Sequence, residues 1–351
     1  MPAESRPAAA SPTQSTRSKA TRLAVWASRS IFGAAALGAM QFVHAPEAAR
    51  TPFAQFVGRS AWASSDAFGT SREVKLRFTL PGQQVEFPLT VVDDPSGLRY
   101  QWVSASDTVP VTLPAPLSGA TVTAPPRPGF YQLVLLHQAP QDSSTTVERV
   151  SEPTLAVMVP FAEKSAGILN GYRIGTYLAE RLGGHEEPQG FLEVQPQDLE
   201  LNVSRHFHLG DFITHDAQAD VWPKYVALNP RLLDKLELVV AEVARMRGVS
   251  PDSMSALDVH SGFRTPAHNA GVPRSARDSR HQYGDAADIV IDADGDGRLT
   301  RSDSKIIASA VDSVEESHPD LVGGLGVYTS NRYRTPYVHI DTRGHRSRWR
   351  G

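Results

Sequence analysis

Short runs in which apolar and polar residues alternate fill the chain from residue 73 to residue 160. Alternation with a period of two places apolar side chains on one face of a β-strand, and the Pro, Gly and Asp residues between the runs favour turns. The expected strands cover residues 74–79, 85–89, 98–103, 109–113, 120–123, 130–136 and 155–159. Strands at this spacing predict a small immunoglobulin-like β-sandwich over 73–160, with Trp102 and Tyr131 in its core. This segment holds no catalytic constellation of side chains, which favours a spacer or a binding module.

A helical pattern replaces the alternation at Asn229. This residue can cap a helix, Pro230 suits the first helical position, and Gly248 can end the helix in a left-handed turn. Apolar residues recur between them at helical spacing, namely Leu232, Leu233, Leu236, Val239, Val240 and Val243. The pattern predicts one long core helix that carries no chemistry of its own.

Strand-like and helix-like segments then follow one another to the end of the chain. Runs at 257–259, 287–291 and 337–341 favour short strands, and residues 303–316 repeat the helical pattern. We expect an α+β domain over 229–351, built from an antiparallel sheet with flanking helices. Residues 161–228 would form a connecting segment packed on this domain.

The connecting segment contains an H-x-H pair, His206 and His208, with His215 nearby. An H-x-H pair can bind a metal ion. Here, however, apolar residues share the stretch 204–212, which favours a structural position at the edge of the core.

The first part of the chain has the features of an export signal. Residues 1–22 have too little apolar content to fold, and residues 23–45 are apolar apart from Arg29. The apolar run after Arg29 suits a signal peptide better than a full membrane span. Both cleavage and retention as an inner-membrane anchor are compatible with it, and residues 46–72 are expected to be a linker. These features predict a protein of the periplasm or cell envelope.

Composition narrows the chemistry that the chain can perform. The formal net charge is −3, which gives no reason to expect a nucleic-acid partner. The chain has no Cys, so any transition-metal site must be built from histidine and carboxylate side chains.

Residues of this kind gather between positions 259 and 303. His281 and Asp288 stand on either side of Gly284, and the spacing suits a turn followed by a strand. A catalytic zinc ion requires three protein ligands and one open position for water. His339, in the predicted strand 337–341, is the best candidate for the third ligand.

The stretch 292–303 fits the twelve-position calcium loop of EF-hands. A glycine stands at position 6, as the sharp turn requires, and an apolar residue stands at position 8. Asp at position 12 replaces the usual Glu, as in dockerin-type loops, and a strand rather than a helix enters the loop. The expected calcium ligands are Asp292, Asp294, Asp296, the Arg298 carbonyl, Thr300 and Asp303. The alternative is a solvated acidic turn.

Three blocks of the sequence, SGFRTPAHNAGV, SRHQYGDAADI and YVHIDTRGHRSRW, resemble those of the zinc D-Ala-D-Ala carboxypeptidase (VanY-like) peptidases. The branch with a terminal VHID…RxW block, which includes periplasmic murein endopeptidases, is the most similar. The resemblance covers roughly residue 165 to the end. It implies that His281, Asp288 and His339 are zinc ligands, that Arg264 faces the substrate, and that Ser279 orients the turn carrying His281.

The chain departs from the family pattern at the general base. Many relatives carry Glu or Asp three residues before the last zinc histidine, or a His two residues before it. Those positions are Pro336 and Tyr337 here. Asp341 would point to the same face of its strand as His339. It is therefore the candidate base, or a carboxylate that orients His339.

Together these features predict an exported zinc-dependent peptidase that hydrolyses amide bonds in peptidoglycan stem peptides or cross-links. It would act as a D,D-carboxypeptidase or an endopeptidase through metal-activated water. The alternative is a catalytically inactive cell-wall binding or structural envelope protein that keeps the peptidase fold.

Overall fold

The computed structural model describes residues 57–59, 70–91, 97–138, 145–183, 186–254, 256–329 and 335–351. The expected leader 1–22 and the apolar segment 23–45 lie outside the described residues, as does most of the linker 46–72. Part of that linker is nevertheless regular, since β1 (Val57–Arg59) pairs antiparallel with β4 (Leu89–Val91). Within the described ranges, no helix combines the length and apolar character needed to cross a membrane.

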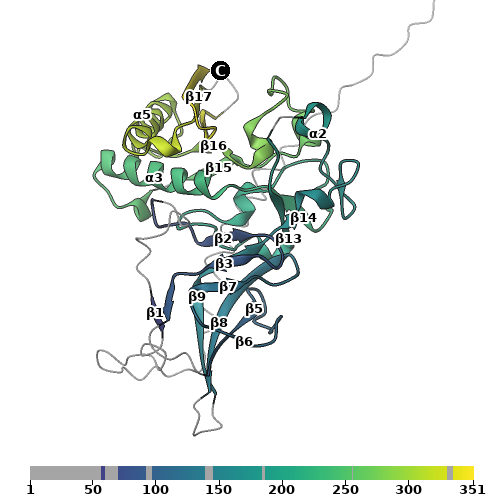
Figure 1. The fold of residues 1–351 in the computed structure, drawn as a ribbon. Coiled ribbons are helices and arrows are strands. Elements are labelled where there is room, and N and C mark those ends of the chain that lie inside the picture. The colour runs from purple at the N-terminus through teal and green to yellow at the C-terminus, as the bar shows by residue number, and fades with distance from the viewer. Residues whose placement is uncertain are drawn as a thin grey trace, which may run out of the picture. The chain divides into compact units, whose positions relative to one another are not determined.

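Two groups of strands share a hydrophobic core in the region 73–157 (Figure 1). The larger is a five-stranded sheet, and β3 (Gln84–Glu86) and β7 (Thr121–Thr123) form a separate antiparallel pair. The larger sheet has the order β2 (Leu76–Thr79), β9 (Thr145–Val157), β8 (Gly129–Gln138), β5 (Leu98–Ser104) and β6 (Ala115–Pro116). Trp102 and Tyr131 are buried in the shared core, as predicted. The immunoglobulin topology stays a prediction, and β2 pairs with β9 in parallel.

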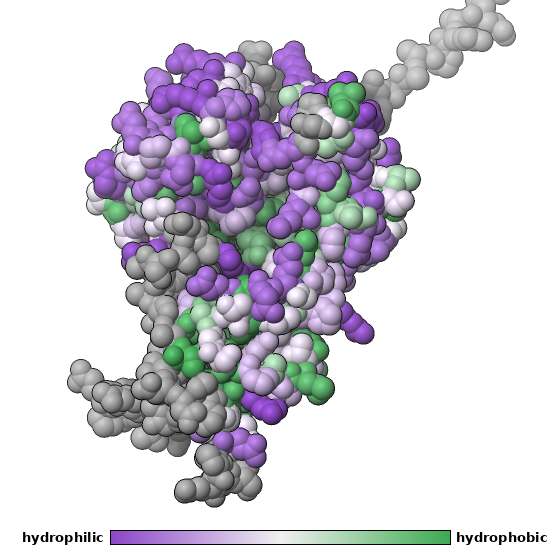
Figure 2. Space-filling model, in the orientation of Figure 1, coloured by the Kyte–Doolittle hydropathy of each residue, from purple (hydrophilic) through white to green (hydrophobic). Residues whose placement is uncertain are grey.

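The prediction of a strand at 109–113 is wrong. Val109, Val111 and Leu113 are 54%, 42% and 88% exposed, and only an isolated bridge joins Pro110 to Val103. Pro110 has no N–H group to donate to a ladder, and the apolar side chains have no facing layer on which to pack. Figure 2 shows apolar residues on the surface of the strand-rich region, at the bottom of the view. The region that carries α3 and α5, at the top, is mostly hydrophilic.

The C-terminal part is built on a second five-stranded sheet. Its order is β15 (Asp258–Ser261), β16 (Ala286–Val290), β18 (Tyr337–Asp341), β17 (Gly324–Tyr328) and β19 (Ser347–Arg350). The pairings are antiparallel except that of β17 with β19, which is parallel and departs from the expected antiparallel sheet. The strands β15, β16 and β18 confirm those predicted at 257–259, 287–291 and 337–341.

Two long helices pack against this sheet and each other, α3 (Pro230–Arg247) and α5 (Arg301–Ser317) (Figure 1). The Asn229 side chain accepts a hydrogen bond from the Arg231 N–H, and Gly248 ends α3 in the left-handed conformation. Both predicted caps of α3 are thus confirmed. The apolar stripe of α3 is fully buried in the main core.

The segment 161–228 shares that core. Its strands β13 (Gly190–Val194) and β14 (Lys224–Val226) form a three-stranded sheet with β10 (Val159–Pro160), which immediately precedes the segment. Hydrogen bonds join the segment to the later chain: Tyr177 Oη donates to the Gln282 carbonyl at 2.9 Å, and Phe263 N–H donates to the Phe212 carbonyl at 3.0 Å. The remaining elements here are β11 (Ile168–Leu169), β12 (Tyr172–Arg173), α2 (Ala179–Leu182) and the 3-10 helices η4 (Phe161–Glu163), η5 (Pro196–Asp198) and η6 (Leu209–Phe212).

Four short helical elements complete the C-terminal part. They are η7 (Pro251–Ser253), α4 (Pro266–Asn269), η8 (Arg280–Tyr283) and η9 (Pro319–Leu321). Two of them lie between β15 and β16: α4 follows Arg264, and η8 carries His281.

Candidate metal centre

The register of the central sheet places two predicted ligands side by side. Asp288 on β16 is the direct antiparallel partner of His339 on β18. Side chains of directly opposed residues project from the same face of a sheet. His281 comes from η8, just before β16, and completes a buried cluster with them.

Backbone geometry explains why His281 reaches that cluster. Gly284 ends η8 with φ +70°, in the left-handed region that glycine tolerates best. A Cβ atom at Gly284 would lie 2.1 Å from the Ala227 carbonyl oxygen, so no other residue fits this close approach. Ser279 precedes η8, but its side chain makes no capping hydrogen bond, and its carbonyl instead accepts from the Gln282 N–H. The backbone of Ser279, and not its side chain, therefore makes the hydrogen bond in the turn that carries His281.

Hydrogen bonds define which ring nitrogen of each histidine faces the cluster. His281 Nδ1 lies 2.7 Å from the Gly262 carbonyl oxygen. Because a carbonyl oxygen can only accept a hydrogen bond, Nδ1 carries the proton and the Nε2 lone pair is available to a metal ion. His281 Nε2, His339 Nδ1 and Asp288 Oδ1 then lie 2.9–3.2 Å from one another. Bonds of about 2.0–2.1 Å at tetrahedral angles would place ligand atoms about 3.3 Å apart. The trio could therefore hold a metal ion with little movement.

Asp341 lies on the other side of the His339 ring. Its Oδ2 is 3.0 Å from His339 Nε2, whereas Nδ1 faces Asp288. The carboxylate is fully buried, and it also accepts hydrogen bonds from the Gly324 N–H and the Arg343 side chain. Of the two roles that the sequence left open, this geometry favours orientation of His339 over service as a base.

The charge state of Asp341 fits that role. Burial alone would raise the pKa of this carboxyl, but hydrogen bonds from His339 and Arg343 outweigh burial and hold the pKa well below its usual range. An ionised Asp341 can accept the His339 Nε2 proton, so that Nδ1 would be available as the ligand atom when a metal ion binds.

Two glycines on β17, Gly324 and Gly326, leave room for the side chains of Asp341 and Trp349. Neither glycine was singled out from the sequence. A Cβ atom at Gly324 would lie 2.3 Å from Asp341 Oδ2, and one at Gly326 would lie 2.4 Å from Trp349 Nε1. The Trp349 indole therefore covers Gly326 and lies with its ring centroid 5.1 Å from that of His339. No strand was predicted at 324–328, but the G-x-G spacing there could have indicated such close packing.

Arg264 contacts the cluster directly. Its Nη2 donates to Asp288 Oδ2 at 2.5 Å, and its Nε donates to Ser261 Oγ at 2.7 Å. Arg264 thus holds one carboxylate oxygen while the other faces the two histidines. The contact with substrate that the family resemblance implies for Arg264 stays a prediction.

A stack of rings borders the cluster. The Tyr337 ring lies 4.5 Å from that of Tyr328 at an angle of 13°, and His260 stacks on Tyr337 at 5.3 Å. Trp349 Nε1 donates to Tyr328 Oη at 2.9 Å. This chain therefore has a stacked tyrosine and Pro336 at the positions where the family that its sequence resembles carries a base.

The calcium loop brings three of its expected ligands together. Asp292, Asp294 and Asp296 can each place an oxygen within 4.8 Å of the others. Gly295 and Gly297 adopt φ of +77° and +79°, and their N–H groups donate to the Asp292 carboxylate. The loop thus curls around Asp292, the most buried of the three.

The other expected calcium ligands have local partners. Thr300 caps α5, and the Asp303 carboxylate accepts from the N–H groups of Thr300 and Ala293 at 2.6 and 2.8 Å. Asp303 is not among the three residues grouped above. Participation of Thr300, Asp303 and the Arg298 carbonyl in a calcium site stays a prediction.

The histidines of the connecting segment do not join a metal group within the described ranges. His206 Nδ1 lies 2.6 Å from Glu237 Oε2, and the His208 N–H donates to Asp211. The predicted structural position of His206 and His208 agrees with these contacts.

Comparison of the chain with protein-family models, curated proteins and solved structures gives no match. The family resemblance therefore rests on the sequence motifs alone. Function has to be argued from the chemistry of the site.

Proposed function

We propose that this chain is a zinc-dependent peptidase that hydrolyses amide bonds in peptidoglycan stem peptides or cross-links. The observation that carries the proposal is the buried cluster of His281 Nε2, His339 Nδ1 and Asp288 Oδ1. Two imidazoles and one carboxylate are the ligand set of many catalytic zinc sites, which keep a fourth position open. The sequence blocks supply the substrate class, as a D,D-carboxypeptidase or an endopeptidase.

Zinc bound by these ligands would polarise the carbonyl of the scissile amide and lower the pKa of a bound water molecule. The chain's own residues set the geometry for that chemistry. The Gly262 carbonyl and the Asp341 carboxylate fix the two imidazole rings. Arg264 neutralises part of the Asp288 charge, and its guanidinium can donate to the oxygen that becomes negative during amide hydrolysis.

The 292–303 loop is proposed to bind calcium and to brace the metal centre. Asp292 follows Asp288 by four residues, so the loop begins where β16 ends. Oxygen ligands at alternate positions around a glycine turn are typical of calcium sites. A bound cation would relieve the repulsion among three neighbouring carboxylates and fix the end of β16.

We place the protein in the periplasm or cell envelope, on the strength of the apolar segment 23–45. That segment is a signal peptide or an inner-membrane anchor in this proposal. The substrate class requires the same location.

A cell-wall binding or structural protein without turnover is the second candidate. The observation that favours it is the position of Asp341 behind His339, together with Pro336 and Tyr337 where relatives carry a base. Such a protein would keep the metal cluster and lack a proton acceptor on its open side.

A muropeptide digest with the full chain separates the two candidates. Zinc-dependent release of D-Ala or of cleaved cross-links, lost with a chelator and restored by zinc, supports the peptidase. His281→Ala should abolish both zinc content and cleavage, while His345→Ala, which changes an exposed histidine, should leave both intact. Binding of muropeptides without cleavage in the presence of zinc would favour the second candidate.

A further inference from the structure

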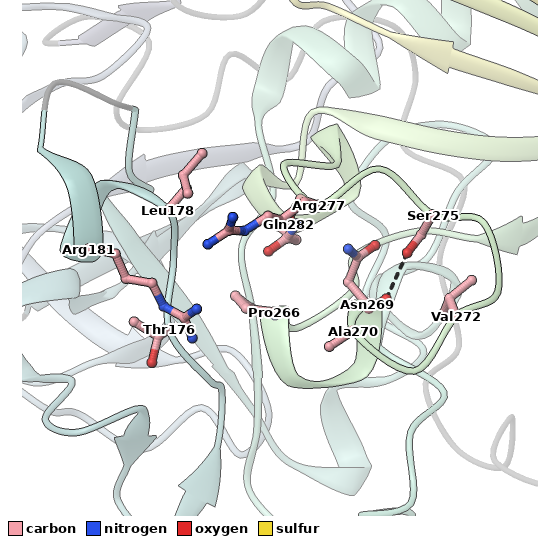
Figure 3. A pocket seen from close by; sticks show the side chains of 10 residues that line it. All are labelled: Thr176, Leu178, Arg181, Pro266, Asn269, Ala270, Val272, Ser275, Arg277 and Gln282. Carbon is pink, nitrogen blue, oxygen red and sulfur yellow. Dashed lines mark hydrogen bonds between the residues drawn. The ribbon is translucent and has the colours of Figure 1, made fainter.

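A cavity of about 360 Å³ lies between residues 176–181 and the loop 266–282 (Figure 3). Its walls come from the short helices α2 and α4 and from the loop that leads into η8. The lining residues are Thr176, Leu178, Arg181, Pro266, Asn269, Ala270, Val272, Ser275, Arg277 and Gln282. None of them is Asp or Glu, so the two arginines give the cavity a positive charge.

Both arginines lack a carboxylate partner within the described ranges. Other arginines of this region are paired: Arg264 with Asp288, and Arg280 with Asp285 and Glu186. Figure 3 shows the guanidinium groups of Arg181 and Arg277 on the same side of the cavity, with Pro266 close to both. Two unpaired guanidinium groups on one cavity attract an anion, and their planar forks suit a carboxylate.

The wall also contains an acceptor without a partner. Asn269 is 3% exposed, and its Nδ2 donates to the Ala276 carbonyl at 2.9 Å, which fixes the amide orientation. Asn269 Oδ1 has no hydrogen-bond partner among the described residues. A buried acceptor left unpaired is unfavourable.

Two lining residues of the cavity closely follow residues of the metal centre in the chain. Gln282 follows the metal-facing His281, and Gln282 Nε2 donates to the Arg277 carbonyl at 3.0 Å. Pro266 follows Arg264 by two residues, and the Arg264 N–H donates to the His281 carbonyl at 3.1 Å. The segment from Arg264 to Gln282 therefore carries His281 of the metal centre and Arg277 of the cavity, whereas Arg181 comes from α2.

We propose that this cavity binds a free carboxylate of the peptide substrate, with Arg181 and Arg277 as its partners. This inference rests on the proposed function, because that function brings a peptide to the neighbouring metal centre. The carboxylate would hold the peptide in register, so that the preference for acidic peptides is set by residues that do not touch the scissile bond.

A binding experiment on the full chain tests the proposal without relying on cleavage. The probes are a fluorescein-labelled stem peptide with its side-chain carboxylate free and the same peptide with that group converted to a primary amide. Fluorescence anisotropy is measured on chelator-treated protein. The free acid should bind wild type about tenfold more tightly than the amide, with a preference that shrinks at high salt.

Three variants locate the effect. Arg181→Gln and Arg277→Gln should each reduce the preference for the free acid to about twofold or less. Arg274→Gln changes an exposed arginine of the same loop that does not line the cavity, and it should keep the preference. On zinc-loaded protein, the two cavity variants should raise KM for the acidic peptide with little change in kcat.

The outcomes distinguish the cavity from the peptidase activity. Equal affinity of wild type for the two peptides, or an undiminished preference in both cavity variants, overturns the proposal. A preference for the free acid without any cleavage supports the cavity and counts against the peptidase. Cleavage without such a preference supports the peptidase and counts against the cavity as a carboxylate site.

Discussion

Asp341 contacts His339 at Nε2, the ring nitrogen opposite to the one that faces Asp288. The His339 ring is thereby held between a carboxylate that can bind a metal ion and one that cannot reach it. The strand geometry causes this arrangement, since residues two apart on β18 project from the same face.

Asp341→Asn should weaken zinc binding by about 10–100-fold, because a neutral amide holds the His339 ring less firmly and makes it a poorer ligand. Competition with a chelating dye measures the affinity. Asp258→Asn, which changes an exposed carboxylate of the same sheet, serves as the control. Unchanged zinc affinity combined with lost cleavage would instead assign Asp341 the role of base.

Gly326→Ala should displace the Trp349 indole, because the new methyl group would lie 2.4 Å from Nε1. We expect a loss of stability of about 1–3 kcal/mol and a change in tryptophan fluorescence. Gly119→Ala is the control, since no atom lies within 4 Å of a Cβ at that position.

A double variant makes this test specific. Trp349→Ala removes the atom that the methyl group would meet, so Gly326→Ala should cost less stability in that background than in wild type. Urea unfolding of the four proteins gives the coupling. Additive costs would show that the two residues do not interact.

Asp296→Asn should reduce the rise in Tm that calcium causes in wild type. A cation that binds only the folded state stabilises it by about 2.7 kcal/mol at a hundredfold excess over Kd. The amide can still accept the hydrogen bond that Arg298 N–H now donates to Asp296, and one carboxylate charge is removed, so Tm in calcium-free buffer should not fall. Asp292 is unsuitable for this test, because its buried carboxylate accepts two backbone hydrogen bonds. A wild-type Tm that ignores calcium would contradict the site.

The pair of His206 and Glu237 should make stability depend on pH. The hydrogen bond with Glu237 raises the pKa of His206 above its usual value, although partial burial opposes the shift. The folded state therefore binds a proton more tightly than the unfolded state. The resulting stabilisation is complete below about pH 6.5 and is lost as pH rises through the raised pKa.

His206→Gln removes the titrating group while keeping a side-chain donor for Glu237. The free energy of unfolding of this variant should change less than that of wild type above about pH 6.5. Denaturant titrations across that range measure the difference. Parallel pH profiles for the two proteins would mean that the pair does not affect stability.

Local patterns were enough to predict the long helix and most strands. The caps of α3 at Asn229 and Gly248 are short-range interactions, so they can be read from neighbouring residues. The strand predicted at 109–113 failed because alternation reports only that one face is apolar. Whether a layer exists to cover Leu113 depends on distant parts of the chain.

The sequence by itself determined which side chains can serve as ligands: the absence of Cys left histidine and carboxylate, and spacing selected His281, Asp288 and His339. Only the tertiary structure decided how they act together. Sheet register, Gly284 and the glycines of β17 bring residues from distant segments within hydrogen-bond distance. The direction of each contact, such as Asp341 binding Nε2 rather than facing the open side, depends on packing in three dimensions. So does the meeting of Arg181 and Arg277 at one cavity, which no spacing along the chain encodes.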